Sequence, residues 1–216
     1  MEFQSLPPFN LIEPERLSKI LSQLKERGVE NLSFASKGYR GVVFKGYLKG
    51  RPVAVKVKRS DTPKEVPLKE FNFLSHLFNL YGPETPAPAP HFATEDFVVM
   101  EWVEGKPFGQ AFKEFGRQVV REALKSVYQL DRAGVEHSEV KGEKHLIFNG
   151  QRVKVIDFES AKFKEKPRNL LQFVGYHLIG KELYRELGLE RGELLKLMEL
   201  YKREPEAAFR ALTSKL

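Results

Sequence analysis

The stretch from Gly134 to Phe163 reads G-V-E-H-S-E-V-K-G-E-K-H-L-I-F-N-G-Q-R-V-K-V-I-D-F-E-S-A-K-F. Its centre holds two short apolar runs, L-I-F at 146–148 and V-K-V-I at 153–156, joined through Asn149-Gly150. An Asn-Gly pair tolerates the positive φ angles of a type I′ turn, and the flanking apolar runs suit strands. The pattern therefore predicts a β-hairpin with its turn at Asn149-Gly150.

The open end of this hairpin is expected to collect charged side chains. A two-residue turn sets Phe148 opposite Gln151 and brings Asp157 opposite the segment 142–144. The side chains predicted to gather there are His137, Glu139, Lys144, His145, Asp157 and Glu159. Carboxylates and basic groups on a rigid ribbon are typical of a metal and phosphate site, although a solvated hairpin with a charged rim also explains this segment taken alone.

The composition describes an ordinary globular protein. The chain has 216 residues, of which 41% are hydrophobic and 30% charged, so one large domain or two small lobes with a real core are expected. No run is long enough to span a membrane and the first residues resemble no signal peptide, so we expect no membrane partner and a cytoplasmic location. The absence of cysteine excludes disulfides and thiolate chemistry, and with the many charged residues it fits a protein from a hot environment.

The positive charge is concentrated in the second half of the chain. The net charge is +7, and residues 104–216 carry 22 Lys and Arg against 17 Asp and Glu, whereas residues 1–103 carry 14 against 12. Such an excess indicates a polyanionic partner such as nucleic acid. A basic surface that serves solubility alone is the other interpretation of the charge.

The first half of the chain predicts a helix followed by three antiparallel strands. Residues 13–27 form an apolar stripe at helical spacing, and Gly28 is a natural stop. The period then changes to two, which predicts strands at about 30–36, 42–48 and 51–59.

Two features of these strands suit a nucleotide. The turn at 37–41 is glycine-rich, so its backbone N–H groups can approach phosphate oxygens. In the third strand Val53, Val55 and Val57 share one face, while Ala54 and Lys56 share the other.

In this order, the features resemble the N-lobe of the protein kinases. The kinase pattern G-x-G-x-x-G-x-V matches residues 36–43 with Ser36 in place of the first glycine, and V-A-V-K at 53–56 matches the motif of the ATP-binding lysine. The resemblance implies an ATP site with Met100 as gatekeeper on a strand at 97–103. Its expected residues are Gly38, Tyr39, Arg40, Gly41, Val43, Ala54, Lys56, Met100, Glu101 and Val103.

A helix at 67–80 is predicted between these strands. Its apolar positions indicate a buried side with Phe71, Leu74, Leu77 and Phe78. The resemblance implies that Glu70 of this helix pairs with Lys56. Asp61 and Glu65 are the other carboxylates that compete for that role.

The second half resembles the catalytic segments of kinases. The motif H-R-D-L-K-P-E-N aligns with H-S-E-V-K-G-E-K at 137–144, and D-F-G aligns with D-F-E at 157–159. The resemblance implies that Glu139 replaces the catalytic aspartate, that Lys141 supports the transferring phosphoryl group, and that Asp157 binds Mg²⁺. With Lys56 and Glu70, these are the expected catalytic residues.

The departures from the kinase pattern change the expected metal ligands. Lys144 falls where a metal-binding asparagine belongs, so Glu159 or His145 would have to join Asp157 around a metal ion. Glu139 is one methylene longer than aspartate, which alters its reach to an acceptor hydroxyl.

The second lobe is predicted to be reduced and helical. Helices are expected at about 115–133, 169–187, 190–202 and 204–214. Only residues 160–168 separate D-F-E from the next helix, and no A-P-E motif follows, so an activation segment is missing.

These features are similar to the atypical archaeal kinases, with RIO kinases as distant relatives. The string K-H-L-I-F…I-D-F-E-S-A is most similar to a small archaeal family that includes a tRNA kinase acting on a uridine 2′-hydroxyl in the variable loop. The resemblance implies transfer of the γ-phosphate of ATP to tRNA. A basic surface beside the site suits RNA, and the residues expected there are Lys144, Lys162, Lys164, Lys166 and Arg168.

The sequence thus predicts an α+β, two-lobed, protein-kinase-like fold. Residues 1–28 are expected to form an N-terminal helical extension, 29–103 an N-lobe with an antiparallel sheet, and 104–216 a reduced helical C-lobe. Two other functions stay open: an atypical RIO-like serine/threonine protein kinase, and a nucleotide-binding pseudokinase that serves as a scaffold.

Overall fold

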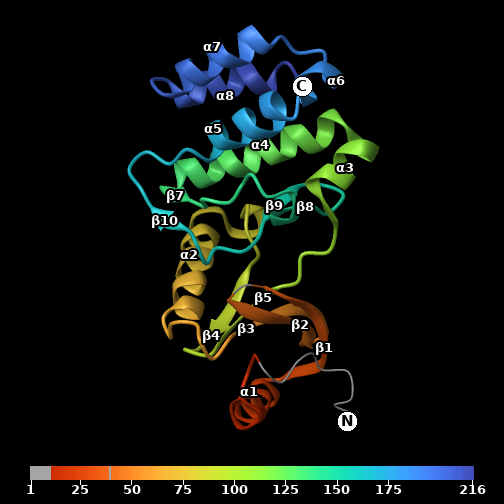
Figure 1. Ribbon diagram of the computed structural model, residues 1–216, viewed down its shortest axis with the longest axis vertical. Helices are drawn as coiled ribbons and strands as arrows, with labels where there is room; N and C mark the ends of the chain where they lie inside the picture. Colours follow the sequence, from red (N-terminus) through yellow and green to blue (C-terminus); the bar gives the residue numbers. More distant parts are fainter. Residues whose placement is uncertain (1–10, 39) are drawn as a thin grey trace. The chain divides into compact units, whose positions relative to one another are not determined.

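The computed structural model describes residues 11–38 and 40–216 (Figure 1). Tyr39, which is expected in the nucleotide site, therefore lies outside the described residues, as does the first part of the expected segment 1–28. The chain divides into two units, residues 1–79 with 88–103 and residues 80–87 with 104–216. Both contain helices and antiparallel strands, so the predicted α+β class is confirmed.

The first unit is built on a five-stranded sheet with the order β1-β2-β3-β5-β4, in which every neighbouring pair is antiparallel. The strands are β1 (Val29–Lys37), β2 (Gly41–Leu48), β3 (Arg51–Lys58), β4 (Pro90–Ala93) and β5 (Phe97–Glu101). The first three agree with the predicted strands to within one residue at each end. The alternating apolar pattern was sufficient to predict β2 and β3, in which buried residues alternate along the strand, although β1 is mostly exposed.

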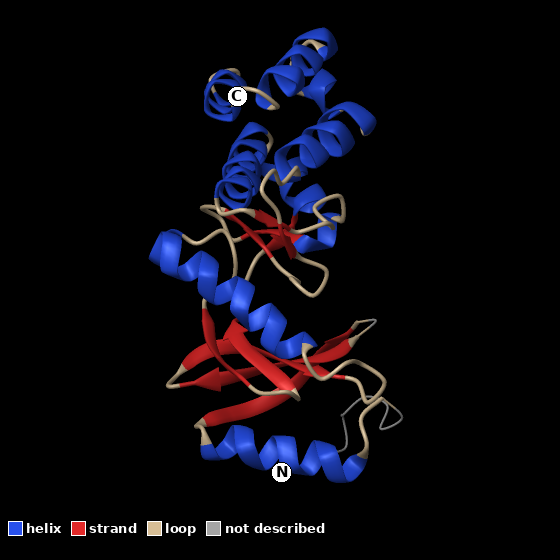
Figure 2. Ribbon diagram, turned by 90° about the vertical axis from the view of Figure 1, so that its left-hand side faces the viewer, coloured by secondary structure: helices blue, strands red, loops and turns tan. Residues whose placement is uncertain are grey.

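Helix α1 (Pro14–Glu26) packs against one face of this sheet, and α2 (Val66–Tyr81) lies on the other face (Figure 2). Leu17, Ile20 and Leu24 of α1 share a core with the three valines of β3, which are at most 1% exposed. Because α1 buries the valine face, Ala54 and Lys56 lie on the face turned towards α2.

The buried side of α2 differs from the predicted one. Phe73, Leu74 and Leu77 are buried, whereas Phe71 is half-buried and Phe78 is 37% exposed. The prediction that Phe71 and Phe78 lie on the buried side was wrong, because it placed Glu70 at the border of that side. In the structure Glu70 is 1% exposed and lies in the middle of that side, which turns the helix accordingly.

The second unit is mainly helical. Its helices are α3 (Phe108–Phe115), α4 (Arg117–Arg132), α5 (Asn169–Phe173), the π-helical segment η3 (Val174–Gly180), α6 (Leu183–Glu186), α7 (Arg191–Tyr201) and α8 (Pro205–Thr213). Short strands form two small sheets, which pair β10 (Lys162–Phe163) with β7 (Val135–Glu136) and β6 (Lys106–Pro107) with β8 (Leu146–Phe148) and β9 (Val153–Val155). Two 3-10 turns complete the unit, η1 (Gly82–Glu84) and η2 (Glu143–His145).

The predicted helices of this unit are present with altered boundaries. Helix α4 begins at Arg117 because Gly116 has a φ of 50°, and this glycine separates α4 from α3, a helix that was not predicted. The helix expected at 169–187 is divided into α5, η3 and α6, and Glu182 with its φ of 56° precedes the last of these. Among the described residues, none of the helices combines the length and the apolar character that crossing a bilayer requires.

The predicted hairpin forms with a different register. Phe148 pairs with Val153, not with Gln151, and the pairing continues to Asn149 and Arg152, so the turn is centred one residue further along the chain. The side-chain oxygen of Asn149 accepts the N–H groups of Gln151 and Arg152 and thereby fixes this turn. The register moves by an even number of residues, so each side chain stays on the predicted face and Asp157 still follows the end of β9 opposite η2.

Candidate functional site

The first unit places a lysine and a glutamate in an ion pair beside its sheet. Nζ of Lys56 on β3 lies 3.1 Å from Oε2 of Glu70 on α2. The lysine side chain is 14% exposed and the glutamate side chain 1%, so little water screens the pair. The predicted pairing is confirmed, whereas Asp61 is exposed and forms an ion pair with Arg59.

Several residues expected at the nucleotide share one face of this sheet. Strand register sets Val43 beside Lys56, and Ala54 beside Met100. These four side chains lie on the face opposite to the core that α1 covers, and Val43, Ala54 and Lys56 are only partly buried. A small side chain beside a lysine on an accessible sheet face can receive a flat base and its phosphates.

The glycine turn has a partly structural explanation. A Cβ at Gly41 would lie 2.9 Å from the carbonyl oxygen of Val57, so glycine is required there by the packing of β2 on β3. Gly38 has more room and its N–H donates to the carbonyl of Gly41, while Arg40 accepts hydrogen bonds at its carbonyl from Arg59 and Thr62. Of the two glycines of this turn, backbone packing therefore explains Gly41 but not Gly38.

At the end of β5, the backbone is partly engaged. The N–H of Glu101 donates to the carbonyl of Ala89, and the N–H of Trp102 donates to the carbonyl of Pro52. The N–H group of Glu101, a residue expected in the nucleotide site, is thus already used within the first unit. Val103 follows these two residues and ends the first unit.

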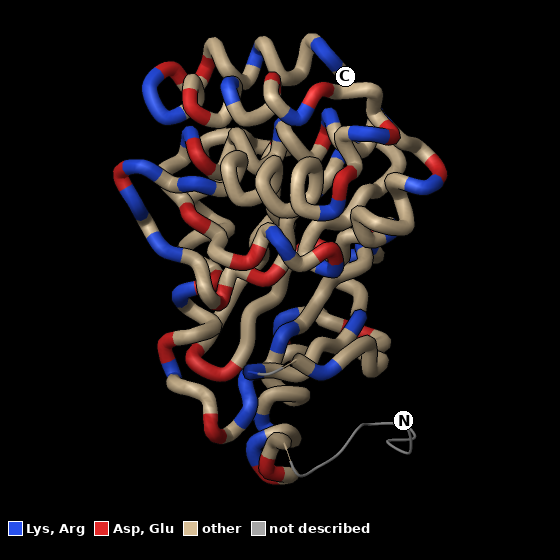
Figure 3. Tube along the Cα trace, turned by 45° about the horizontal axis from the view of Figure 1, so that its top comes forward, with Lys and Arg blue, Asp and Glu red and all other residues tan. Residues whose placement is uncertain are grey.

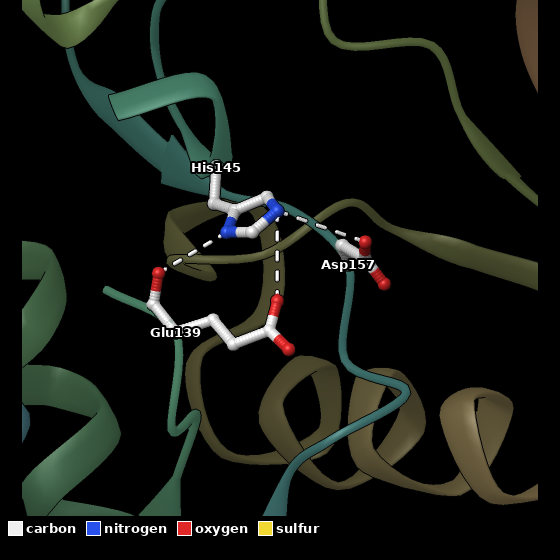
Figure 4. Close-up of side chains that lie close together, drawn as sticks. All are labelled: Glu139, His145 and Asp157. Atoms are coloured by element: carbon white, nitrogen blue, oxygen red, sulfur yellow. Dashed lines mark hydrogen bonds and ion pairs between the residues drawn. The ribbon is translucent and has the colours of Figure 1, made fainter. Parts of the chain in front are cut away.

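The second unit gathers three potential metal ligands, Glu139, His145 and Asp157 (Figure 4). Their ligand atoms all lie within 4.8 Å of one another. Nε2 of His145 is 3.7 Å from Oε2 of Glu139 and 3.7 Å from Oδ2 of Asp157. The hairpin places the last two because η2 ends at His145 just before β8, and Asp157 follows just after β9.

This group contains Glu139 in place of the expected Glu159. Phe158 between Asp157 and Glu159 is fully buried and packs edge-on against His137, with ring centroids 4.8 Å apart. Asp157 and Glu159 thus flank a residue that anchors the chain in the core. Glu139 reaches the group from the segment that follows β7.

The backbone is held in an unusual conformation on both sides of this group. Ser138 has a φ of 73° and Asp157 a φ of 71°, which few residues other than glycine adopt. Such strain of about 1–3 kcal/mol per residue is concentrated in proteins at functional sites. Ser138 immediately precedes Glu139, and the second position is Asp157 itself, so both unusual backbone conformations lie at the acids of this group.

Neighbouring groups fix the orientation of the ligands. Ser160 donates a hydrogen bond of 2.9 Å to Oε1 of Glu139, which leaves Oε2 turned towards His145. Nδ1 of His145 lies 3.1 Å from the carbonyl oxygen of Glu139, so this nitrogen carries the proton and donates. A Cβ at Gly142 would lie 2.9 Å from Nδ1, so glycine is needed there to admit the imidazole.

His137 supports the site through hydrogen bonds and does not belong to the group of potential metal ligands. Its Nδ1 accepts the N–H of Glu139, and its Nε2–H donates to the carbonyl of Ile156. It thereby ties together the two segments that carry the acids. Burial lowers the pKa of His137 to about 4, which keeps the ring neutral and preserves its acceptor nitrogen.

A buried polar network holds His137 in turn. Oδ1 of Asn169 accepts the N–H of His137, and the Asn169 amide donates to Asp131 and to the carbonyl of Val135. Asp131 also accepts the hydroxyl of Tyr201, and burial raises the pKa of Asp131. The sequence reasoning missed Ser160, Asn169, Asp131 and Tyr201, because their roles depend on contacts between residues far apart in the chain.

The residues expected to bind RNA lie on the surface of the second unit. Lys144 is exposed on η2 and Lys162 on β10. Lys164, Lys166 and Arg168 are exposed in the segment between β10 and α5, which is mainly blue in Figure 3. Lys164 forms an ion pair of 2.5 Å with Glu136, so its charge is partly offset. Lys141, expected to support the phosphoryl group, is also exposed.

Comparisons with known proteins give two similarities. The uncharacterized protein MJ1211 of Methanocaldococcus jannaschii is 27% identical over 112 residues, which cover 48% of this chain and 97% of that protein. The mitogen-activated protein kinase kinase kinase dlk-1 of Caenorhabditis elegans is 24% identical over 172 residues, which cover 76% of this chain but only 18% of that kinase. No protein-family model matches the chain.

Proposed function

We propose that this protein is an ATP-dependent phosphotransferase that transfers the γ-phosphate to a ribose 2′-hydroxyl of tRNA or another structured RNA. The observation that carries the proposal is the convergence of the Glu139 and Asp157 carboxylates on His145. The resemblance of the sequence motifs matches these two residues to the catalytic-loop and metal-binding acids of kinases. The similarity to a named kinase over 76% of the chain gives independent support.

In this proposal the two units are the two lobes of a reduced protein-kinase-like fold, and ATP is the nucleotide. The accessible sheet face with Val43 and Ala54, next to the buried Met100, receives the base. Lys56, which Glu70 holds in place at 3.1 Å, contacts the phosphate oxygens of the triphosphate. Phosphoryl transfer requires mainly positioning and neutralisation of charge, which a held ammonium group supplies.

The residues of the second unit act on the acceptor and the leaving phosphate. Glu139 orients the ribose hydroxyl and takes its proton on Oε1, the oxygen that is not turned towards His145, as the bond from the 2′-oxygen to the γ-phosphorus forms. The bond from the γ-phosphorus to the bridging oxygen breaks, and ADP leaves. Asp157, His145 and Oε2 of Glu139 offer the donor set for a divalent cation, whose chemistry would be to neutralise charge on the phosphate oxygens.

The basic segment 162–168 favours an RNA acceptor. Three of its cations, Lys162, Lys166 and Arg168, are exposed and belong to a stretch that starts two residues after Ser160, the hydrogen-bond donor to Glu139. In this proposal these cations hold the phosphodiester backbone on either side of the ribose. The RNA contact in this proposal positions the acceptor and reads no base sequence.

An atypical serine/threonine protein kinase is the second candidate, and the similarity to the kinase of C. elegans favours it. The site chemistry is the same, so the acceptor decides between the two. Purified protein is incubated with [γ-³²P]ATP, Mg²⁺ and either bulk tRNA or bulk protein, with the Asp157→Asn variant as background. We expect label in tRNA. Label in protein alone selects the second candidate, and tight ATP binding without any transfer selects a nucleotide-binding scaffold.

A further inference from the structure

His145 is a buried side chain whose outer nitrogen faces two carboxylates. The residue is 7% exposed, and within the described part of the chain its Nε2 makes no hydrogen bond. The nearest charged atoms are the carboxylate oxygens of Glu139 and Asp157, both at 3.7 Å. This distance is too long for a hydrogen bond and requires a physical explanation.

The other ring nitrogen determines what Nε2 can do. Because Nδ1 donates to the carbonyl of Glu139, the neutral ring carries its proton on Nδ1 and presents a lone pair at Nε2. A lone pair that faces two anionic oxygens is electrostatically unfavourable, and a cation bound among the three atoms removes this repulsion. A hydrogen bond from the distal N–H to a backbone carbonyl is also how proteins orient histidines that bind metals.

The two distances from Nε2 of His145, to Glu139 and to Asp157, suit a shared metal ion. Two ligands about 2.1 Å from a shared ion are roughly 3.7 Å apart when their bonds diverge by about 120°. The carboxylate side chains of Glu139 and Asp157 are 43% and 36% exposed, so positions of the coordination sphere remain open to water or phosphate. Ser160 holds Glu139 in the required orientation through the oxygen that the ion does not need.

We propose that Glu139, His145 and Asp157 bind one divalent cation of the first transition row, such as Mn²⁺, without any nucleotide, and that they prefer it to Mg²⁺. Oxygen ligands suit Mg²⁺ and Mn²⁺ alike, whereas an imidazole ligand favours the transition ions. This inference deepens the proposed function, because it names the cation of the same site. It does not depend on ATP or on the acceptor.

The test is a metal titration of the whole chain after treatment with a chelator, with ATP and RNA absent. Mn²⁺ binding is followed by electron paramagnetic resonance of the free ion, and Mg²⁺ is used as a competitor. We expect one Mn²⁺ per chain, bound at least about tenfold more tightly than Mg²⁺. Weak binding without saturation, or equal affinity for both ions, would overturn the proposal.

Substitutions show whether the imidazole is the ligand that selects the ion. His145→Gln should weaken Mn²⁺ binding by about tenfold or more and change Mg²⁺ binding little. The matched control is His76→Gln on α2, which should leave Mn²⁺ affinity unchanged. Circular dichroism confirms that both variants are folded, and an unchanged Mn²⁺ affinity in folded His145→Gln would contradict the assignment.

A measurement on the ring itself distinguishes a metal ligand from an imidazolium paired with two carboxylates. Nitrogen NMR of the histidines, with Zn²⁺ as the diamagnetic probe, should show His145 protonated at Nδ1 and a shift at Nε2 on addition of Zn²⁺. Protons on both nitrogens that persist in the presence of the metal would overturn the proposal. Because no nucleotide is used, metal binding without RNA labelling would refute only the proposed function, and RNA labelling without a selective metal site would refute only this inference.

Discussion

The ammonium group of Lys56 lies 3.1 Å from a carboxylate oxygen of Glu70, whose side chain is 1% exposed. This pair joins the accessible face of the sheet to the buried side of α2. In the proposed reaction the pair holds the lysine at the phosphates. It also has a consequence for stability, because removing one partner leaves the other charge buried and uncompensated.

Lys56→Met is expected to lower the free energy of unfolding by about 3 kcal/mol, since Glu70 then remains buried without its cation. The double variant Lys56→Met/Glu70→Met should regain most of this loss because both charges are gone. Urea unfolding measures all three proteins. As a control, Lys106→Met breaks the exposed pair with Glu114, whose side chains are 49% and 48% exposed, and should change stability by less than about 1 kcal/mol. Equal stability of the two Lys56 variants would show that the pair is not energetically coupled.

The geometry of the acidic group predicts which carboxylate matters for transfer. Asp157→Asn should lower the rate of phosphoryl transfer by on the order of a hundredfold or more, because it removes a ligand of the cation. Glu159→Gln should retain most of the activity, since Glu159 does not belong to the group with His145. Single-turnover transfer from labelled ATP gives both rates. A larger loss in Glu159→Gln than in Asp157→Asn would restore the ligand set expected from the sequence.

Much of the secondary structure of the first unit was predictable, because short stretches of sequence are enough to identify its strands. Alternating apolar residues with Gly and Lys-Gly turns define β1 to β3, and the V-A-V-K run identifies Lys56 within them. The partner Glu70 was found through the resemblance to kinases. The orientation of α2 was not predicted, because a charged residue in the middle of a buried helix face breaks the apolar pattern that predicts the buried side.

The hairpin shows that turn residues in the sequence predict that a turn forms but not the register of the strands. The Asn-Gly pair correctly predicted that a turn joins the two strands. Its centre lies one residue further along the chain than predicted, where the side chain of Asn149 accepts two backbone N–H groups. The acids still converge, since the shift preserves the faces of the strands. The network of Asp131, Asn169 and Tyr201 joins α4, α5 and α7, and no local pattern reports such distant contacts.

The basic segment predicts how RNA binding depends on salt. Replacing Lys162, Lys166 and Arg168 by alanine should weaken binding to tRNA and reduce the slope of log affinity against log salt by about 2–3, because fewer counterions are released. Fluorescence anisotropy at several salt concentrations measures the slope. The control removes three other exposed cations, Lys196, Lys202 and Arg203, and changes the net charge equally. The same reduction in both variants would mean that net charge, and not this segment, governs binding.

His137 predicts the dependence of stability on pH. Burial lowers its pKa from 6.5 to about 4, so below pH 6.5 the unfolded chain takes up a proton that the folded chain does not. The contribution of the neutral ring is present above pH 6.5 and declines by about 3 kcal/mol as the pH falls to 4. Urea unfolding should show that the stability difference between wild type and His137→Gln shrinks over this range. A difference that is constant with pH would exclude His137 as the titrating group.

The site of the label in RNA tests the central claim most directly. After incubation with [γ-³²P]ATP and the protein, tRNA is digested with alkali, which cleaves the chain only where a free 2′-hydroxyl can attack the adjacent phosphodiester. An internal 2′-phosphate blocks that attack, so we predict that the label appears in a dinucleotide that resists alkali. Label in a nucleoside 3′,5′-bisphosphate, which marks the 5′ end of the RNA, or no label in RNA at all, would contradict transfer to a ribose 2′-hydroxyl.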